Sequence, residues 1–142
     1  MCTAHSKGVR VVTAANFDVS QLSNSTSRKE WIEQQIETVK TNYADGINID
    51  IESPITDSTQ KSFLTLLVKE TQRAFQLEIP YAQLTVDVAW SPDCIDLRCY
   101  DYVGLSQHSD FLVVMDYDLR SQIRGPCVAS ANSPLELVVE GM

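Results

Sequence analysis

The stretch that decides the fold is DGINIDIE at residues 45–52, in which isoleucine occupies every second position. Successive side chains of a β-strand point to opposite faces. The isoleucines therefore share one face, and Asn48, Asp50 and Glu52 share the other. Burying carboxylates without partners costs several kcal/mol, so this polar stripe predicts a functional site if the strand is enclosed.

Outward from this stretch, short apolar runs alternate with amphipathic segments. The pattern predicts strands at 8–14, 46–52, 83–90 and 110–118, helices at 27–44 and 56–79, a loop-rich helical connection at 91–109 and the start of another helix after residue 125. This order predicts an α/β fold of parallel strands joined by right-handed crossovers, with helices burying both faces of the sheet. No repeat or linker divides residues 1–142, so we expect one domain.

The two long helices carry apolar residues at three- and four-residue steps. Ser27 and Glu30 suggest a capping box for the first helix, and Asp57 or Ser58 suits the start of the second. The residues expected on the buried faces are Trp31, Ile32, Ile36, Val39, Tyr43, Phe63, Leu66, Leu67, Ala74, Phe75 and Leu77.

Composition excludes some classes of partner. The net charge of −8 repels phosphate backbones and anionic lipid, so we expect no nucleic-acid and no membrane partner. No apolar run approaches the roughly 20 residues that span a bilayer, and the N-terminal stretch MCTAHSKGVRVV lacks the apolar core of a signal peptide. The chain suits a neutral ligand or an acidic compartment.

The four cysteines are widely and unevenly spaced and form no zinc-binding pattern. We expect buried free thiols at Cys2, Cys94, Cys99 and Cys127, with a disulfide as the alternative in a secreted protein. Asn24 begins an N-glycosylation sequon, which has meaning only in the secretory pathway.

Polar and aromatic residues gather where the predicted strands end. They are Asp87 and Trp90 on one strand and Met115, Asp116, Tyr117 and Asp118 on another. The carboxyl ends of parallel strands are where α/β proteins place ligands. A single acidic residue there is equally well explained by helix capping or solvent exposure, and packing explains a single aromatic one. Three inward polar groups on one short strand are harder to explain by packing. Asp50 and Glu52 are also close enough in sequence to couple electrostatically, which would raise the pKa of one carboxyl.

Two motifs carry a resemblance to a known family. DGINIDIE resembles the D-x-x-D-x-D-x-E signature of the family 18 glycoside hydrolases, with Asp45, Asn48, Asp50 and Glu52 at the marked positions. MDYD at 115–118 is similar to the M-x-Y-D motif of that family. Asn48 in place of an aspartate resembles the chitobiase branch. The S-x-G-G motif of many chitinases is absent, and VVTAANFD stands in its place.

The resemblance implies a (β/α)8 TIM barrel and a retaining, substrate-assisted glycosidase without a protein nucleophile, metal or cofactor. Glu52 would be the general acid and base, while Asp50 would hold the substrate acetamido group and Asn48 would position Asp50. Tyr117 would also bind the acetamido group. The remaining substrate-binding residues implied are Asp118, Met115 and Trp90, the last either stacked on a sugar ring or packed in the core.

The same resemblance implies a chitooligosaccharide or N-acetylglucosamine-containing glycan as substrate, and a lysosomal location. A complete barrel needs about 250 residues, so we expect residues 1–142 to be a partial catalytic domain covering roughly strands three to six. Two alternatives remain open. One is an inert half-barrel or sugar-binding protein that needs a partner copy to close. The other is an unrelated α/β fold whose acidic strand binds a divalent cation.

Overall fold

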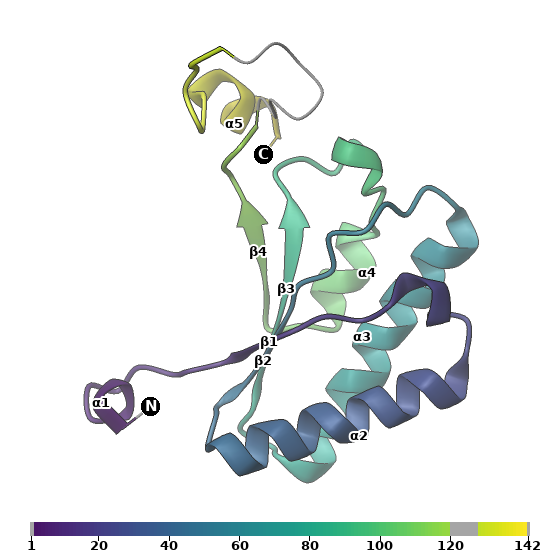
Figure 1. Cartoon of the computed structure of the whole chain (residues 1–142), viewed down its shortest axis with the longest axis vertical. Helices are drawn as coiled ribbons and strands as arrows, with labels where there is room; N and C mark the ends of the chain where they lie inside the picture. The colour runs from purple at the N-terminus through teal and green to yellow at the C-terminus, as the bar shows by residue number, and fades with distance from the viewer. Residues whose placement is uncertain (1, 120–127, 142) are drawn as a thin grey trace.

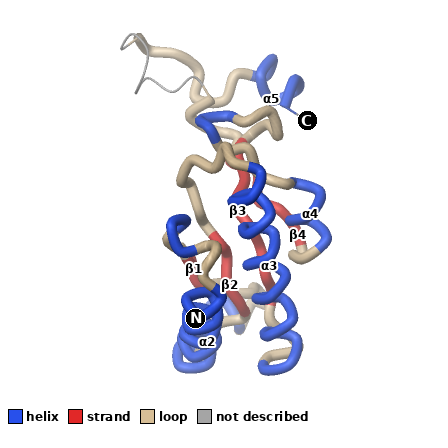
Figure 2. The backbone as a smooth tube through the Cα atoms, turned by 90° about the vertical axis from the view of Figure 1, so that its right-hand side faces the viewer, coloured by secondary structure: helices blue, strands red, loops and turns tan. Residues whose placement is uncertain are grey.

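The computed structural model describes residues 2–119 and 128–141 and contains one four-stranded parallel sheet in the order β1-β2-β3-β4. The strands are β1 (Thr13–Ala15), β2 (Gly46–Ile49), β3 (Gln83–Ala89) and β4 (Phe111–Met115). The helices α2 (Ser25–Asn42), α3 (Ser58–Glu78) and α4 (Tyr102–Gln107) lie together on one side of the sheet (Figures 1 and 2). The predicted α/β class is confirmed.

Short elements complete the described chain. They are α1 (Cys2–His5), the 3₁₀ turns η1 (Val19–Gln21) and η2 (Ile95–Leu97), and α5 (Leu135–Gly141). The η2 turn and α4 form the predicted loop-rich connection. In Figure 1, α1 projects away from one end of the sheet and α5 lies beyond the carboxyl ends of β3 and β4.

Every strand is shorter than the sequence pattern predicts, and the difference matters most at β2. This strand ends at Ile49, so Asp50 and Glu52 lie just beyond it. The ladder extends by one bond, in which the Asp50 amide donates to the Ala15 carbonyl over 2.9 Å. At the other end, Gly46 has a φ of +147°, and a side chain there would collide with the backbone of Gln83. Only glycine permits this close approach of β2 to β3.

The three isoleucines of DGINIDIE are almost fully buried, as predicted, with exposed fractions of 0% for Ile47 and Ile49 and 2% for Ile51. They form part of the hydrophobic core together with Leu67, Val68 and other residues of α3. The prediction that helices bury both faces of every strand is wrong. Phe111, Val113 and Val114 of β4 are exposed, and Asn48, Asp50 and Glu52 are less buried than the isoleucines between them.

The capping box predicted at Ser27 and Glu30 is wrong. The N-cap of α2 is Asn24, whose side-chain oxygen accepts hydrogen bonds from the amides of Thr26 and Ser27 at 3.0 and 3.2 Å. The helix therefore begins two residues earlier than predicted, because asparagine caps as well as serine does. Asp57 caps α3 in the same way, as predicted.

Two residues assigned to the buried helix faces are exposed instead. Tyr43 follows the last turn of α2 in a left-handed conformation with φ of 53°, and its exposed fraction is 82%. Leu77 on α3 is 84% exposed. Both residues lie in or just after the last turn of their helix, where the apolar spacing continues but the side chain is exposed.

A buried arginine joins the two long helices. Arg28 of α2 donates to both carboxylate oxygens of Glu70 on α3, at 2.8 and 3.2 Å, and to the Leu22 carbonyl at 2.5 Å. Its guanidinium also lies 5.7 Å from the centre of the Phe63 ring. These contacts satisfy the buried charge and fix how α2 packs on α3.

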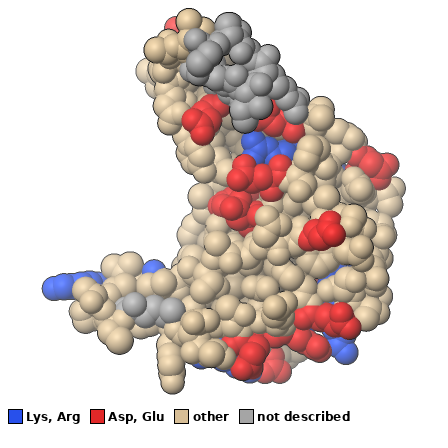
Figure 3. Space-filling model, viewed as in Figure 1, with Lys and Arg blue, Asp and Glu red and all other residues tan. Residues whose placement is uncertain are grey.

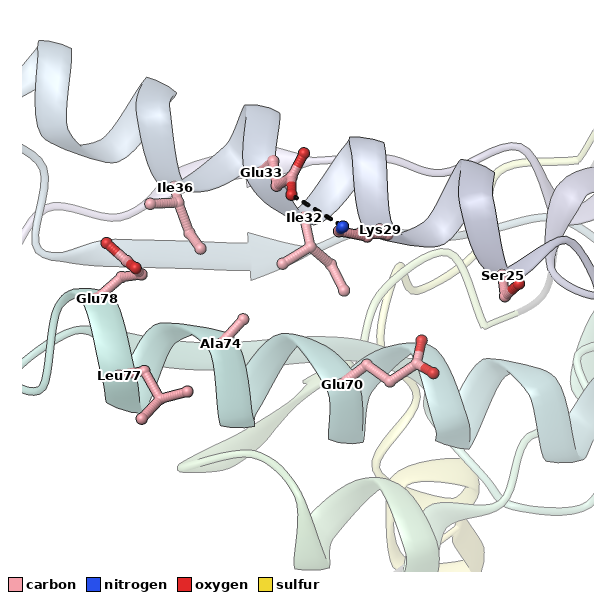
Figure 4. Close-up of a pocket in the computed structure, with 9 residues that line it drawn as sticks. All are labelled: Ser25, Lys29, Ile32, Glu33, Ile36, Glu70, Ala74, Leu77 and Glu78. Carbon is pink, nitrogen blue, oxygen red and sulfur yellow. Dashed lines mark ion pairs between the residues drawn. The ribbon is translucent and has the colours of Figure 1, made fainter.

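The groove between α2 and α3 has a volume of about 470 Å³ and is lined only by residues of the two helices and their ends. Figure 4 shows Ile32 and Ile36 pointing from α2 toward α3, with Ala74 facing them. Lys29 and Glu33 form an ion pair of 3.8 Å at its rim. The groove belongs to the helix layer and contains none of the predicted site residues. None of the described helices is long and apolar enough to cross a bilayer.

Candidate active site

The candidate site lies at the carboxyl ends of the four strands. Because the strands are parallel and in register, Asn48 of β2 pairs with Thr85 of β3, and Asp87 lies two residues further along β3. Figure 3 shows acidic side chains gathered around a basic group at this end of the sheet. The sheet thus brings together residues that are far apart in the chain.

Asn48 contacts β3, not Asp50. Its side-chain amide donates to Asp87 Oδ2 over 2.8 Å, and its side-chain oxygen accepts from the Thr85 hydroxyl over 2.6 Å. The prediction that Asn48 positions Asp50 by a hydrogen bond is therefore wrong in its partner. Asn48 is paired with Thr85 in the register of β2 against β3, and Asp87 lies two residues further along the same face of β3, so the Asn48 side chain reaches both.

Asp87 is a half-buried carboxyl with an unusual environment. Burial raises its pKa most, the hydrogen bond from Asn48 lowers it, and the neighbouring carboxylates Asp50 and Glu52 raise it further. Asp50 Oδ1 and Asp87 Oδ1 are both buried and accept no hydrogen bond from any described residue. The raised pKa expected for a carboxyl in this cluster thus falls on Asp87, which the sequence motif does not mark.

Glu52 is the accessible carboxylate of the cluster, with 60% of its side chain exposed. The prediction that it points into an enclosed centre is not met within the described residues. Its Oε2 forms an ion pair of 3.2 Å with Nη1 of Arg98, whose side chain is only 11% exposed. The other terminal nitrogen of Arg98 lies 3.3 Å from Asp96. Arg98 is a site residue that the sequence analysis missed.

Two tyrosines of the segment after β3 fix the backbone of the site. The Tyr100 hydroxyl lies 2.6 Å from the Ile51 carbonyl and 2.9 Å from the Ser53 carbonyl, the two residues that flank Glu52. The Tyr102 hydroxyl binds the carbonyls on either side of Trp90 in the same way, at 2.6 and 3.0 Å. Burial raises the pKa of both phenols, that of Tyr102 to about 12. Both therefore remain donors at physiological pH.

The loop that carries Arg98 is closed by a disulfide between Cys94 and Cys99. The expectation of free thiols is wrong for this pair, which uneven spacing alone does not reveal. Cys2 is exposed rather than buried, and Cys127 lies outside the described residues. Cys94 and Asp96 have positive φ values of 57° and 50°. The crosslink and these turns hold the loop against Ile55, which exchanges backbone hydrogen bonds of 2.9 and 3.0 Å with it.

The residues predicted on the fourth strand divide by burial. Met115 ends β4 and is buried, whereas Tyr117 and Asp118 lie past the strand and are exposed. Burial raises the pKa of Tyr117, and the charges of Asp87, Glu52 and Asp50 raise it further. Tyr117 is therefore close enough to the acidic cluster for its pKa to respond to these charges. The Asp118 amide donates to the Asn132 side chain over 3.0 Å, which ties this turn to the segment before α5.

Trp90 is half-buried at the end of β3, and its ring lies against Gly141 of α5, where a side chain at Gly141 would collide with it. Asp116 Oδ1 is a third buried carboxylate oxygen without a described partner. Within residues 2–119 and 128–141, no group of three or more histidine, cysteine, aspartate or glutamate side chains is arranged to hold a metal ion. The cation-binding alternative therefore has no ligand set among those residues.

Comparison with known proteins assigns the family. The model of glycosyl hydrolases family 18 matches residues 11–140. The chain belongs to this family. A relative from Dictyostelium discoideum named "Probable di-N-acetylchitobiase 2" is 52% identical over 94% of the chain, and the di-N-acetylchitobiase of Mus musculus is 48% identical over 99%. The chain spans only 35% and 39% of the length of these two relatives.

The fold of the family is also seen in solved structures. A chitinase from Bacteroides thetaiotaomicron superimposes with a TM-score of 0.75, at 21% sequence identity, over 98% of this chain and 42% of its own. At that identity the likeness shows the fold alone. Together with the parallel four-stranded sheet, it identifies the fold of this family 18 chain as a partial (β/α)8 barrel.

The four marked positions of the family signature occupy two ends of the sheet. Asp45 lies before β2, where its carboxylate accepts from the Val11 amide at 2.6 Å and from His5 at 2.8 Å. Asn48, Asp50 and Glu52 lie at the carboxyl end. The first position, Asp45, therefore connects the segments that precede β1 and β2, and the other three positions belong to the candidate active site.

Proposed function

We propose that this chain carries the acid–base and acetamido-binding residues of a glycosidase that hydrolyses β-1,4-linked N-acetylglucosamine in chitobiose, chitooligosaccharides and N-glycan cores. The observation that carries the proposal is the placement of Glu52. Its carboxylate is exposed, its backbone is fixed on both sides by Tyr100, and it lies near the half-buried carboxyls of Asp50 and Asp87. The names of the relatives, which share about half of its residues, support the same substrate class.

The mechanism we infer needs one protein carboxyl to transfer protons. Glu52 donates a proton to the glycosidic oxygen while the carbonyl oxygen of the substrate's own N-acetyl group attacks the anomeric carbon. The glycosidic carbon–oxygen bond breaks, and a cyclic oxazolinium forms. Glu52 then takes a proton from water, which adds to the anomeric carbon from the opposite face and restores the N-acetyl group. Two inversions give net retention.

Asp50 would accept a hydrogen bond from the acetamido N–H and stabilise the positive charge of the oxazolinium. Tyr117 would donate to the acetamido group, because its raised pKa keeps the phenol protonated. Asp118 would contact sugar hydroxyls and Met115 would shape the pocket floor. Asn48 acts through Asp87, and Trp90 offers a partly exposed ring for stacking.

A lysosomal location is part of the proposal. The disulfide between Cys94 and Cys99 supports an oxidising route through the secretory pathway, where such crosslinks form and persist. An exposed asparagine begins the sequon at Asn24, and its Oδ1 rather than its amide nitrogen caps α2. The nitrogen that would carry a glycan is therefore not used in the cap.

The experiment that tests the proposal compares Glu52→Gln with Asp96→Asn in hydrolysis of N,N′-diacetylchitobiose-type oligosaccharides at about pH 4–6. Both residues are exposed carboxylates bound to Arg98, at 3.2 and 3.3 Å, so the two variants disturb the same ion-pair network. We expect Glu52→Gln to lower kcat by about 10²–10⁴-fold, the range of general acid–base catalysis. Asp96→Asn should retain most of the activity.

Equal losses in the two variants would indicate that the ion pair, not the proton of Glu52, matters, and would contradict the assignment. A folded 142-residue chain that binds the disaccharide without cleaving it would favour the sugar-binding alternative for this polypeptide. The exposed side chains of β4 favour that alternative as long as nothing covers them.

A further inference from the structure

Two neighbouring carboxyls in the candidate site each leave a buried oxygen without a donor. Asp50 Oδ1 and Asp87 Oδ1 receive no hydrogen bond from the described part of the chain. An unpaired buried acceptor costs about 1–3 kcal/mol, and more if it is charged. Two ionised carboxylates would also repel each other. One proton held between them removes both penalties, since a protonated carboxyl becomes a donor to its neighbour.

The surrounding hydrogen bonds determine which oxygen of Asp87 is free. The Thr85 hydroxyl donates to Asn48 Oδ1 over 2.6 Å, which orients the Asn48 amide so that its nitrogen faces Asp87. That nitrogen donates to Asp87 Oδ2 over 2.8 Å. Oδ2 is thus occupied as an acceptor, and Oδ1 remains for the proton. Thr85 and Asn48 together leave Asp87 one oxygen, Oδ1, that can carry a proton and donate it to Asp50.

We propose that Asp87 and Asp50 hold one proton between them, and that Asp87 is the positioning residue that donates this proton to Asp50. Asp50 then keeps a negative charge and a fixed orientation without being protonated itself. The pairing of Ile49 with Val86 places Asp50 and Asp87 next to each other at the end of the ladder, so the inference of a shared proton does not depend on the proposed function. Its consequence for catalysis rests on the proposed function: a charged Asp50 accepts the acetamido N–H and faces the developing positive charge. Asp87 does not touch the substrate in this scheme.

The charged and titratable groups that face Asp87 come from two neighbouring segments. Asp50 and Glu52 follow β2, and Tyr117 follows β4. Burial raises the pKa of Asp87 most, the hydrogen bond from Asn48 lowers it, and hydrogen bonding to Asp50 and the charges of Asp50 and Glu52 raise it further. Among variants at these positions, one at Asp50 tests the shared proton directly, because it removes the partner carboxyl.

The test is a pH titration of the Asp87 carboxyl carbon by NMR in the ¹³C-labelled 142-residue chain. We expect Asp50→Asn to lower the pKa of Asp87 by about 1, and Glu52→Gln to lower it by less. Asn48→Leu should raise it, because the donor to Oδ2 is lost. Asp96→Asn should leave it unchanged. An unchanged pKa of Asp87 in Asp50→Asn would overturn the shared proton.

If Asp50→Asn fails to fold, Asp50→Ala replaces it, because it also removes the neighbouring carboxyl, and an unchanged pKa of Asp87 in that variant would overturn the proposal. The titration needs no substrate, so it is separate from the hydrolysis assay. If the pKa of Asp87 shifts as expected but Glu52→Gln does not affect hydrolysis, the proposed function is wrong and the shared proton is supported. If hydrolysis depends on Glu52 but the pKa of Asp87 does not change in Asp50→Asn, the proposed function is supported and the shared proton is wrong.

The catalytic readout is the pH profile of Asp87→Asn. This variant keeps the shape and a donor but no titrating proton. We expect kcat to become less dependent on pH on its alkaline side while KM changes little. A loss of kcat that is the same at every pH would indicate a structural role and contradict positioning by the shared proton.

Discussion

The two ends of the sheet treat carboxylates in opposite ways. At the amino end, Asp45 accepts from the Val11 amide and from His5, and Asp110 accepts from the Leu84 amide over 2.7 Å. Each carboxylate joins two neighbouring strands. At the carboxyl end, Asp50 and Asp87 each keep a buried oxygen that no described group satisfies. The pKa of Asp45 is lowered, chiefly by the Val11 hydrogen bond, and that of Asp87 is raised, chiefly by burial.

The contrast teaches that one residue type serves stability at one end and chemistry at the other. A carboxylate whose acceptors are filled by the protein has nothing left for a ligand. Carboxyls with an oxygen that accepts no hydrogen bond from the protein weaken the fold, but they can bind a donor from a substrate or share a proton with a neighbouring carboxyl. Parallel barrels separate these roles by end in this way, with ligands at the carboxyl ends of the strands.

The largest effect is expected from a substitution in the hydrophobic core between the two ends of the sheet. Ile49 is fully buried between Asn48 and Asp50. Ile49→Ala should lower the free energy of unfolding by about 2–5 kcal/mol, because it leaves a cavity under the site. Leu77→Ala is the control, since Leu77 is exposed on α3 and should change stability by less than about 0.5 kcal/mol. Urea denaturation followed by circular dichroism measures both. Equal effects would contradict the burial of Ile49.

Much of this fold follows from local pattern. Alternating isoleucines predict β2, and three- and four-residue spacing predicts α2 and α3, because burial of one face governs both. The ends of the elements do not follow. Tyr43 and Leu77 continue the apolar period at the ends of their helices but are exposed. Asn24 replaced the predicted cap because several residues near the helix start are suitable, and only the chain path selects one.

The site was predicted less completely, since its contacts cross between strands. The motif positions Asn48, Asp50 and Glu52 do lie at the carboxyl end, as predicted. Arg98 and Tyr100 belong to a loop that no motif marks, and the partner of Asn48 depends on the register of β2 against β3. The four residues CYDY at 99–102 carry one signal that could have been used, because tyrosines in a short connecting segment are suited to donate hydrogen bonds from buried positions.

Two tyrosines at the carboxyl end, Tyr100 and Tyr102, allow stability and catalysis to be tested separately. Tyr100→Phe removes the donor that holds both carbonyls around Glu52, and Tyr102→Phe removes the donor around Trp90. Each should cost about 1–3 kcal/mol of unfolding free energy, because buried acceptors lose their partner. Only Tyr100→Phe should lower kcat strongly, since Glu52 is the group that transfers protons. A larger loss of kcat in Tyr102→Phe would place the main backbone constraint at Trp90 instead.

The smallest effects separate the two ends by the sign of their pH dependence. Asp45 has a lowered folded-state pKa, so its contribution to stability is present above the unfolded pKa of about 3.9 and is lost as pH falls through the folded pKa. Asp87 has a raised folded-state pKa, so its contribution is full below about pH 3.9 and is lost as pH rises through the folded pKa. Thermal unfolding between about pH 3 and 7 measures both.

Relative to wild type, Asp45→Asn should lower Tm near neutral pH, with a deficit that shrinks on acidification. Asp87→Asn should raise Tm near neutral pH, with a gain that shrinks in the same direction, because the wild-type carboxyl is then already protonated. The two residues lie at opposite ends of the sheet, so the double variant should show the sum of the two changes at each pH. If Asp87→Asn lowered Tm at neutral pH, the ionised carboxylate would be stabilising. The distinction between a strand-joining end and a ligand-binding end would then fail at its central residue.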